Sequence, residues 1–268
     1  QGQVVAGVGE AGVGKSRLFY EFTRSHHAHG WLLLASHSVS YGKATAYLPI
    51  LDLLKGYYQI APQDDARRRR EQVTGKLLTL DRALEPMLPA LLALLEVPVE
   101  DPQWQACDPP QRRRRMLDAV KHLLLRESQV QPLGLVFEDL HWIDTETQAL
   151  LDSLVESLPT AHLLLLVNYR PEYHHGWGNK TYYTQLQLDP LLSEHAEELL
   201  QALVGDELGL QPLGLAQLAV AAFEDEALDP RVGAAQRQRQ VTVAQIDALQ
   251  QVAHGQARAF HAAFDLRR

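Results

Sequence analysis

Five segments of strand length occur along the chain, and most of them are apolar throughout. They are Gln3–Val8, Trp31–Ala35, Leu133–Phe137, Leu163–Val167 and Thr184–Leu188. Continuous apolar runs are typical of strands buried on both faces, as in parallel sheets that carry helices on each side. We therefore predict an α/β fold with a parallel sheet of about five strands and helices on both faces.

Between the second and third strands, apolar residues recur at helical spacing. This holds from residue 47 to residue 126, and prolines divide the segment into several helices. The prolines are Pro86, Pro89, Pro98, Pro102, Pro109 and Pro110. The last of these helices has an apolar stripe that leads into the third strand, formed by Leu117, Val120, Leu123 and Leu124.

Local signals predict where two other helices begin and end. Gly30 is expected to terminate the helix that follows the first strand. After the third strand, Thr145 and Gln148 have the spacing of a capping box, and Asp144 is an alternative cap. The helix that follows has an apolar face at Leu150, Leu151, Leu154, Val155 and Leu158, and it ends at Pro159.

A glycine-rich octet follows the first strand directly. It reads Gly9-Glu10-Ala11-Gly12-Val13-Gly14-Lys15-Ser16, which matches Gly-x-x-x-x-Gly-Lys-Ser/Thr, the phosphate-binding loop or Walker A motif. Its glycines let the backbone N–H groups curl around phosphates, and the helix that starts near Arg17 favours anions at its N-terminus. We expect Lys15 to reach the terminal phosphates and Ser16 to ligate Mg²⁺. The alternative is a glycine-rich turn with an incidental lysine.

Two acids end the third strand, as a Walker B motif requires. We expect Glu138 to hold Mg²⁺ and Asp139 to orient the attacking water. The commoner order is Asp-Asp or Asp-Glu. This departure is compatible with nucleotide binding and puts the rate of hydrolysis in question. The alternative is a pair of solvated carboxylates at a strand end.

Polar residues also follow the fourth strand, at the edge where open α/β sheets bind ligands. Arg170 is a candidate sensor that reports the γ-phosphate through a charge-assisted hydrogen bond, and Asn168 is a weaker candidate. The alternative for Arg170 is an ion pair with a carboxylate such as Glu172.

These segments resemble the nucleotide-binding domain of the signal-transduction ATPases with numerous domains, a branch close to the AAA+ ATPases. The resemblance rests on residues 9–18, Val-Phe-Glu-Asp-Leu-His-Trp-Ile-Asp at 136–144 and Leu-Val-Asn-Tyr-Arg-Pro-Glu-Tyr at 166–173, with a further likeness at 40–49. The chain is most similar to bacterial regulators in which such an ATPase lies between an adenylate/guanylate-cyclase-type domain and tetratricopeptide repeats. The resemblance implies ATP binding, slow hydrolysis, and the Arg170 strand between the Walker A and Walker B strands.

The resemblance covers residues 1–205, which we expect to form a P-loop ATPase domain. Relatives carry a segment upstream of the first strand that contacts adenine, so the chain is expected to be a fragment. A helix is expected over 194–204, and residues 206–268 are expected to form a helical extension.

Net charge, cysteine content and the length of the apolar runs limit the classes of function that the chain can have. The chain has 25 Lys and Arg against 33 Asp and Glu, a net charge of −8, so we expect no general affinity for nucleic acid. Cys107 is the single cysteine, which excludes an internal disulfide and indicates a reducing compartment, hence a cytoplasmic protein. No apolar run approaches the roughly 20 residues that cross a membrane.

Several other residue groups have structural interpretations. We expect Arg67–Arg70 and Arg112–Arg115 to be solvated helix ends. The histidines at 26, 27 and 29 and the pair at 174–175 are not expected to bind metal. His141 and Trp142 are interpreted as packing residues, with His141 a lesser candidate for contact with water.

The leading hypothesis is an ATP–Mg²⁺ switch whose partners are other domains or proteins of a signalling assembly. The alternative is a non-hydrolysing module that binds proteins or DNA. A phosphotransferase acting on a small acceptor is a weaker third hypothesis, because no Arg-rich lid follows the third strand.

Overall fold

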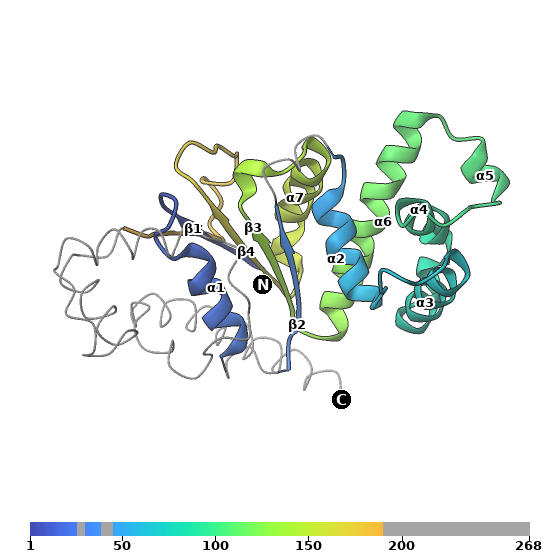
Figure 1. Ribbon diagram of the computed structural model, residues 1–268, viewed down its shortest axis with the longest axis horizontal. Helices are drawn as coiled ribbons and strands as arrows, with labels where there is room; N and C mark the ends of the chain where they lie inside the picture. The colour runs from blue at the N-terminus through green and yellow to red at the C-terminus, as the bar shows by residue number, and fades with distance from the viewer. Residues whose placement is uncertain (26–29, 39–44, 190–268) are drawn as a thin grey trace.

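A computed structural model describes residues 1–25, 30–38 and 45–189 (Figure 1). Within these ranges five strands form one sheet in the order β2-β3-β4-β1-β5, and all neighbours are parallel. The strands are β1 (Gln3–Val8), β2 (Leu32–His37), β3 (Leu133–Glu138), β4 (Leu163–Tyr169) and β5 (Tyr183–Gln187). The predicted parallel α/β fold is confirmed, and β4 lies between the Walker A and Walker B strands as expected.

The two faces of the sheet have separate apolar layers. On one face α1 (Lys15–Arg24) packs its buried Leu18 and Phe22 against Val5 and Leu166. The strand residues that alternate with these, such as Val4 and Leu165, point to the other face. There they pack against α2 (Leu48–Tyr58), α6 (Pro109–Val130) and α7 (Thr145–Ser157). Figure 1 shows α1 and the group α2, α6 and α7 on opposite sides of the sheet. This alternation follows from the period of two along a strand.

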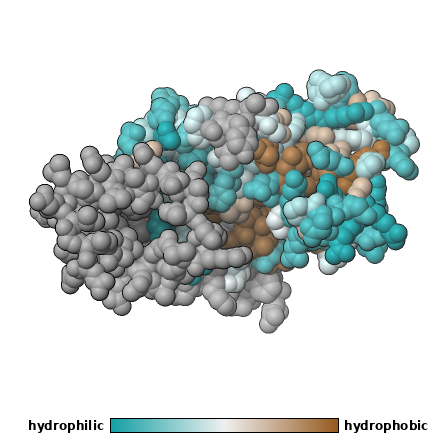
Figure 2. All heavy atoms as spheres, viewed as in Figure 1, coloured by the Kyte–Doolittle hydropathy of each residue, from teal (hydrophilic) through white to brown (hydrophobic). Residues whose placement is uncertain are grey.

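The remaining α-helices are α3 (Ala66–Leu80), α4 (Leu88–Leu94) and α5 (Pro102–Gln105). The 3₁₀ helices are η3 (Arg82–Met87), η4 (Leu140–Trp142) and η5 (Leu158–Thr160), and η4 and η5 lie before and after α7 in the chain. Of these helices, α3, η3 and α4 pack on α6 and on one another, whereas η4 packs on β4 and η5 on α7. Prolines occupy the first turn of α2, α4, α5 and α6. They therefore start helices, because their missing N–H has no intrahelical partner there. Figure 2 shows a mostly hydrophilic surface over α3 to α5. None of the helices in the described ranges is long and apolar enough to span a membrane.

Two expected helix ends are wrong. The helix α1 ends at Arg24, where Ser25 turns to an extended conformation, so Gly30 does not terminate it. Gly30 has a φ of 84° in the turn before β2, a conformation that glycine adopts without strain. At α7 the cap is Asp144, so the alternative is confirmed, and the capping-box interpretation is wrong because Thr145 is already helical. The helix expected over 194–204 and the extension at 206–268 lie outside the described residues.

Asp144 also joins α7 to the start of α2. Its Oδ1 accepts hydrogen bonds from the backbone N–H groups of Glu146 at 3.0 Å, Thr147 at 3.1 Å and Tyr47 at 3.1 Å. Its Oδ2 accepts from the Thr147 hydroxyl at 2.6 Å. The carboxylate is buried, so each of these donors depends on it.

We expect Asp144→Ala to lower the free energy of unfolding by about 2–3 kcal/mol, because it removes a helix cap and leaves buried donors without partners. Urea unfolding measures the change. The matched control is Asp108→Ala, which removes an exposed cap with one hydrogen bond to Gln111. Its expected cost is about 1 kcal/mol or less. Equal losses in the two variants would contradict the proposed role of Asp144.

Candidate nucleotide-binding site

The phosphate-binding loop connects β1 to α1, and its glycines occupy positions that other residues cannot. Gly12 and Gly14 have φ values of 78° and 90°, in the left-handed region that favours glycine. At Gly9 an added Cβ would lie 2.5 Å from the carbonyl oxygen of Leu188. The first glycine is therefore required for close approach, and the other two are required for backbone curvature.

Lys15 folds back over this loop. Its side chain is buried, with the residue only 7% exposed, and Nζ donates to the carbonyl oxygens of Gly9 at 3.0 Å and Glu10 at 2.7 Å. Burial lowers the pKa of Lys15, and the charge of Asp139 is the largest influence that opposes this shift. The Lys15 ammonium therefore interacts electrostatically with Asp139, the second acid of the Walker B motif.

The next two residues of α1 differ in their surroundings. Ser16 is exposed in the first turn of the helix. Arg17 is half-buried and forms an ion pair with Glu21 one turn further along α1. The predicted role of Ser16 as a magnesium ligand fits this placement, since a hydroxyl oxygen is a donor that Mg²⁺ accepts.

The two acids lie at the carboxyl end of β3, two strands away from β1. Glu138 is 8% exposed, and its Oε1 lies 3.3 Å from His37 Nδ1. The Asp139 side chain is 30% exposed, and its backbone has a φ of 56°. The first acid is thus buried at the end of the strand, while the second is partly exposed.

Asn168 fixes the relative position of the two acids. Its buried side-chain amide accepts a hydrogen bond from the Asp139 N–H at 2.8 Å and donates to Glu138 Oε2 at 3.2 Å. The sequence predicts Asn168 as a weaker phosphate sensor. In the structure its amide instead contacts the acidic pair, because β4 lies beside β3.

His37 is a site residue that the predicted second strand does not include. It pairs in register with Glu138 across the β2–β3 ladder, which brings the two side chains together. The expected second strand ended at Ala35, whereas β2 continues to His37. Extending that strand by two residues would have placed a histidine beside the first acid.

Arg170 lies directly after β4 at the same edge of the sheet. It is half-buried, and its charge lowers the pKa of Lys15, which places the two cations in one electrostatic environment. No ion pair between Arg170 and Glu172 occurs in the part of the chain that the structure describes. The sensor role of Arg170 stays a prediction.

The segment after Arg170 is anchored to α7 by aromatic residues. The Trp177 N–H donates to His175 Nδ1 at 3.1 Å, and its indole Nε1 donates to Asp152 Oδ1 at 2.8 Å. The rings of His175 and Trp177 stack at 4.5 Å, and Tyr169 OH lies 2.8 Å from His175 Nε2. Burial lowers the pKa of His175. His175 is therefore a packing residue, and no group of three potential metal ligands occurs among the described residues.

The two arginine runs are engaged within the protein. Arg68 pairs with Asp64 at 3.0 Å, and Arg113 pairs with Glu146 at 2.5 Å. The side chains of Arg68 and Arg113 are 68% and 54% exposed, which agrees with the expected solvated helix ends, although Arg113 pairs with a buried carboxylate. Cys107 is buried, and its Sγ lies 3.1 Å from the Gln103 carbonyl.

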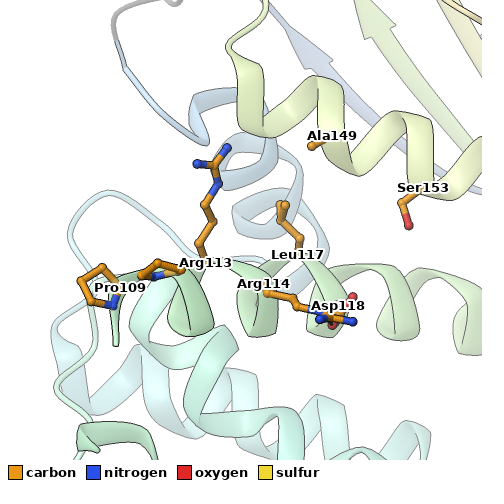
Figure 3. Close-up of a pocket in the computed structure, with 8 residues that line it drawn as sticks. Pro109, Arg113, Arg114, Leu117, Asp118, Ala149 and Ser153 are labelled. Atoms are coloured by element: carbon orange, nitrogen blue, oxygen red, sulfur yellow. Dashed lines mark ion pairs between the residues drawn. The ribbon is translucent and has the colours of Figure 1, made fainter. Parts of the chain in front are cut away.

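A groove of about 470 Å³ lies between α6 and α7, on the helical side of the molecule. In Figure 3 Leu117 on α6 points toward Ala149 on α7, and Asp118 lies beside Arg114 on α6. None of the predicted nucleotide-binding residues lines it. The groove is therefore separate from the candidate site.

The fold and the site together define a P-loop nucleotide-binding domain. Residues 2–167 match the family described as the AAA ATPase domain, and the chain belongs to this family. A similar protein is the uncharacterized protein R02095 of Rhizobium meliloti (strain 1021), which is 27% identical over 207 residues. The match covers 75% of this chain and 19% of that protein, so the chain spans about a fifth of its relative's length.

We expect Asn168→Leu to lower the free energy of unfolding by about 2–3 kcal/mol, because both the Asp139 N–H and a Glu138 oxygen lose a buried partner. Chemical denaturation measures the loss. The control Gln129→Leu changes an exposed amide on α6 and should alter stability by less than about 0.5 kcal/mol. If Asn168→Leu unfolds like the parent, the bridge between the two acids does not hold the site.

Proposed function

We propose that this domain binds ATP with Mg²⁺ and acts as a nucleotide-controlled switch that hydrolyses ATP slowly. One observation carries the proposal: the phosphate loop after β1, with the buried ammonium of Lys15, and the acidic pair after β3 emerge at the same edge of the parallel sheet. Membership of the AAA ATPase family supports nucleotide binding and Mg²⁺ as its usual companion. The residues at this edge of the sheet fit both ATP and Mg²⁺, since they include a phosphate loop, the Ser16 hydroxyl and two carboxylates.

Each site residue would have a distinct role. The backbone N–H groups of residues 9–14 and the Lys15 ammonium would hold the phosphates, and Lys15 would exchange two loop carbonyls for phosphate oxygens. Ser16 and Glu138 would hold Mg²⁺, whose charge would offset that of the phosphates. Arg17 completes the predicted nucleotide-binding segment.

Asp139 would orient the attacking water, and Arg170 would contact the γ-phosphate. Asp139 is one methylene shorter than the glutamate commonly found as the second acid, so its carboxylate reaches less far from a backbone that Asn168 holds. A less well placed water reduces the rate of the chemical step. This geometry supports slow hydrolysis and a long-lived bound state, as a switch requires.

The connection between Arg170 and α7 supports a conformational response. The Tyr173 hydroxyl donates to Gln148, and Trp177 donates to Asp152, so two anchors join the segment after Arg170 to α7. A change in the contacts of Arg170 would act on that helix through these anchors. The long relative supports partners in the form of further domains or proteins. On this proposal residues 1–205 form the ATPase domain, and residues 206–268 form an extension.

We expect Lys15→Ala to weaken ATP binding ten- to a hundredfold, because it removes a charged hydrogen bond worth about 1.5–3 kcal/mol. Isothermal calorimetry in the presence of Mg²⁺ measures the dissociation constants. The control Lys121→Ala removes a cation on α6 that bonds Ser153, and it should leave the affinity within about twofold. Equal affinities for the parent and Lys15→Ala would refute the assignment of the phosphate loop.

We expect Asp139→Asn to lower phosphate release by roughly a hundredfold or more while ATP binding changes little, because an amide is a poor acceptor for the proton of water. Glu138→Gln should raise the Mg²⁺ concentration needed for half-maximal ATP binding. Phosphate release and Mg²⁺ titrations measure the two effects. A parent that binds ATP and releases no phosphate would instead support the alternative, a non-hydrolysing module that binds proteins or DNA.

A further inference from the structure

His141 is buried beside the candidate site and lacks hydrogen-bond partners. It lies in η4, two residues after Asp139, and it is 7% exposed. Both ring nitrogens are shielded from solvent, and neither has a partner in the described part of the chain. Native proteins leave few buried polar atoms in this state, and such atoms often mark functional positions.

Packing alone does not account for an imidazole here. The ring of His141 contacts Trp142 at a centroid distance of 5.1 Å, and the buried Leu140 precedes it. A phenylalanine would fill a similar volume and would not bury two ring nitrogens whose hydrogen bonds to water are lost. The imidazole therefore destabilises the folded state relative to an apolar ring, unless its nitrogens gain a partner.

Among the charged groups that act on His141, the carboxylate of Asp139 has the largest influence. His141 Nδ1 lies 3.9 Å from Asp139 Oδ1, about 1 Å beyond hydrogen-bond length. The backbone of Asp139 is held by Asn168, whereas its side chain is 30% exposed and can rotate. A small rotation of this carboxylate would close the distance.

The charges around His141 are those of the candidate site. Asp139 and Glu172 favour its protonated form, while Arg170 and Lys15 disfavour it. Burial has the largest influence and lowers the pKa of His141, so the ring is neutral near pH 7. A neutral imidazole has one N–H donor and one acceptor nitrogen, which is sufficient to donate to one carboxylate oxygen.

We propose that His141 is a positioning residue, whose Nδ1–H donates to Asp139 when the site binds ATP and fixes the carboxylate oxygen that faces the attacking water. This inference rests on the proposed function. His141 does not contact the reacting atoms and acts through Asp139. It raises the rate of hydrolysis and leaves the affinity for ATP unchanged.

Four variants of the full chain test this role through phosphate release and ATP binding. His141→Phe keeps the volume and removes both nitrogens, so kcat should fall about tenfold while the dissociation constant of ATP stays within twofold. His141→Asn places an amide N–H near the position of Nδ1 and should restore much of the rate. His141→Gln places its amide near the position of Nε2 and should not. The control His162→Phe changes a histidine next to the start of β4 and should leave kcat unchanged.

A double-variant cycle separates positioning from a structural effect. Added to Asp139→Asn, His141→Phe should cost no further rate, because the group it orients is already lost. Thermal unfolding of His141→Phe should occur at or above the temperature of the parent. An unchanged kcat in His141→Phe, a full second loss in the double variant, or rescue by Gln in place of Asn would each overturn the inference. If the parent itself hydrolyses no ATP, the proposed function and this inference both fail. If the parent hydrolyses ATP and His141→Phe has the same kcat, only the inference about His141 is overturned and the proposed function stands.

Discussion

The parallel register of three neighbouring strands is the constraint on which the site depends. Because β1, β4 and β3 run in the same direction, the phosphate loop after β1, Arg170 after β4 and the acids after β3 all emerge at one edge. Lys15 and Asp139 are far apart in the sequence, yet the charge of Asp139 opposes the lowering of the Lys15 pKa by burial. An antiparallel β3 would place the acids at the opposite edge, out of reach of any phosphate held by the loop.

The site combines fixed and adjustable parts. Glu138 is held by Asn168 on one side and lies beside His37 on the other, so the carboxylate assigned to Mg²⁺ is preorganised. Asp139 has a fixed backbone and a freer side chain, with His141 within a small rotation of it. Preorganisation favours binding, whereas an adjustable second acid makes the rate sensitive to what surrounds it. This division is consistent with a domain that binds nucleotide well and turns it over slowly.

The sequence predicts the sheet and the loop because their signals are local. A buried parallel strand must be apolar at nearly every position, and the curled loop needs glycine where φ is positive, as at Gly12 and Gly14. The contacts of Asn168 and His37 with the acids, and the link from Asp144 to Tyr47, depend on strand register and tertiary packing, so no local pattern indicates these contacts. The sequence marks Asp144 as a candidate cap, but its bond to Tyr47 joins residues that lie 97 positions apart.

The central claim is that the loop and the acidic pair act on the same bound nucleotide, and a thermodynamic cycle tests it most directly. The dissociation constant of Mg²⁺–ATP is measured for the parent, Lys15→Ala, Glu138→Gln and the double variant. Groups that contact one polyphosphate and its metal should be coupled by about 0.5–3 kcal/mol. The loss of affinity in the double variant should therefore differ from the product of the losses in the two single variants. Losses that multiply within error would show that Lys15 and Glu138 act independently, and the account of the site would be contradicted.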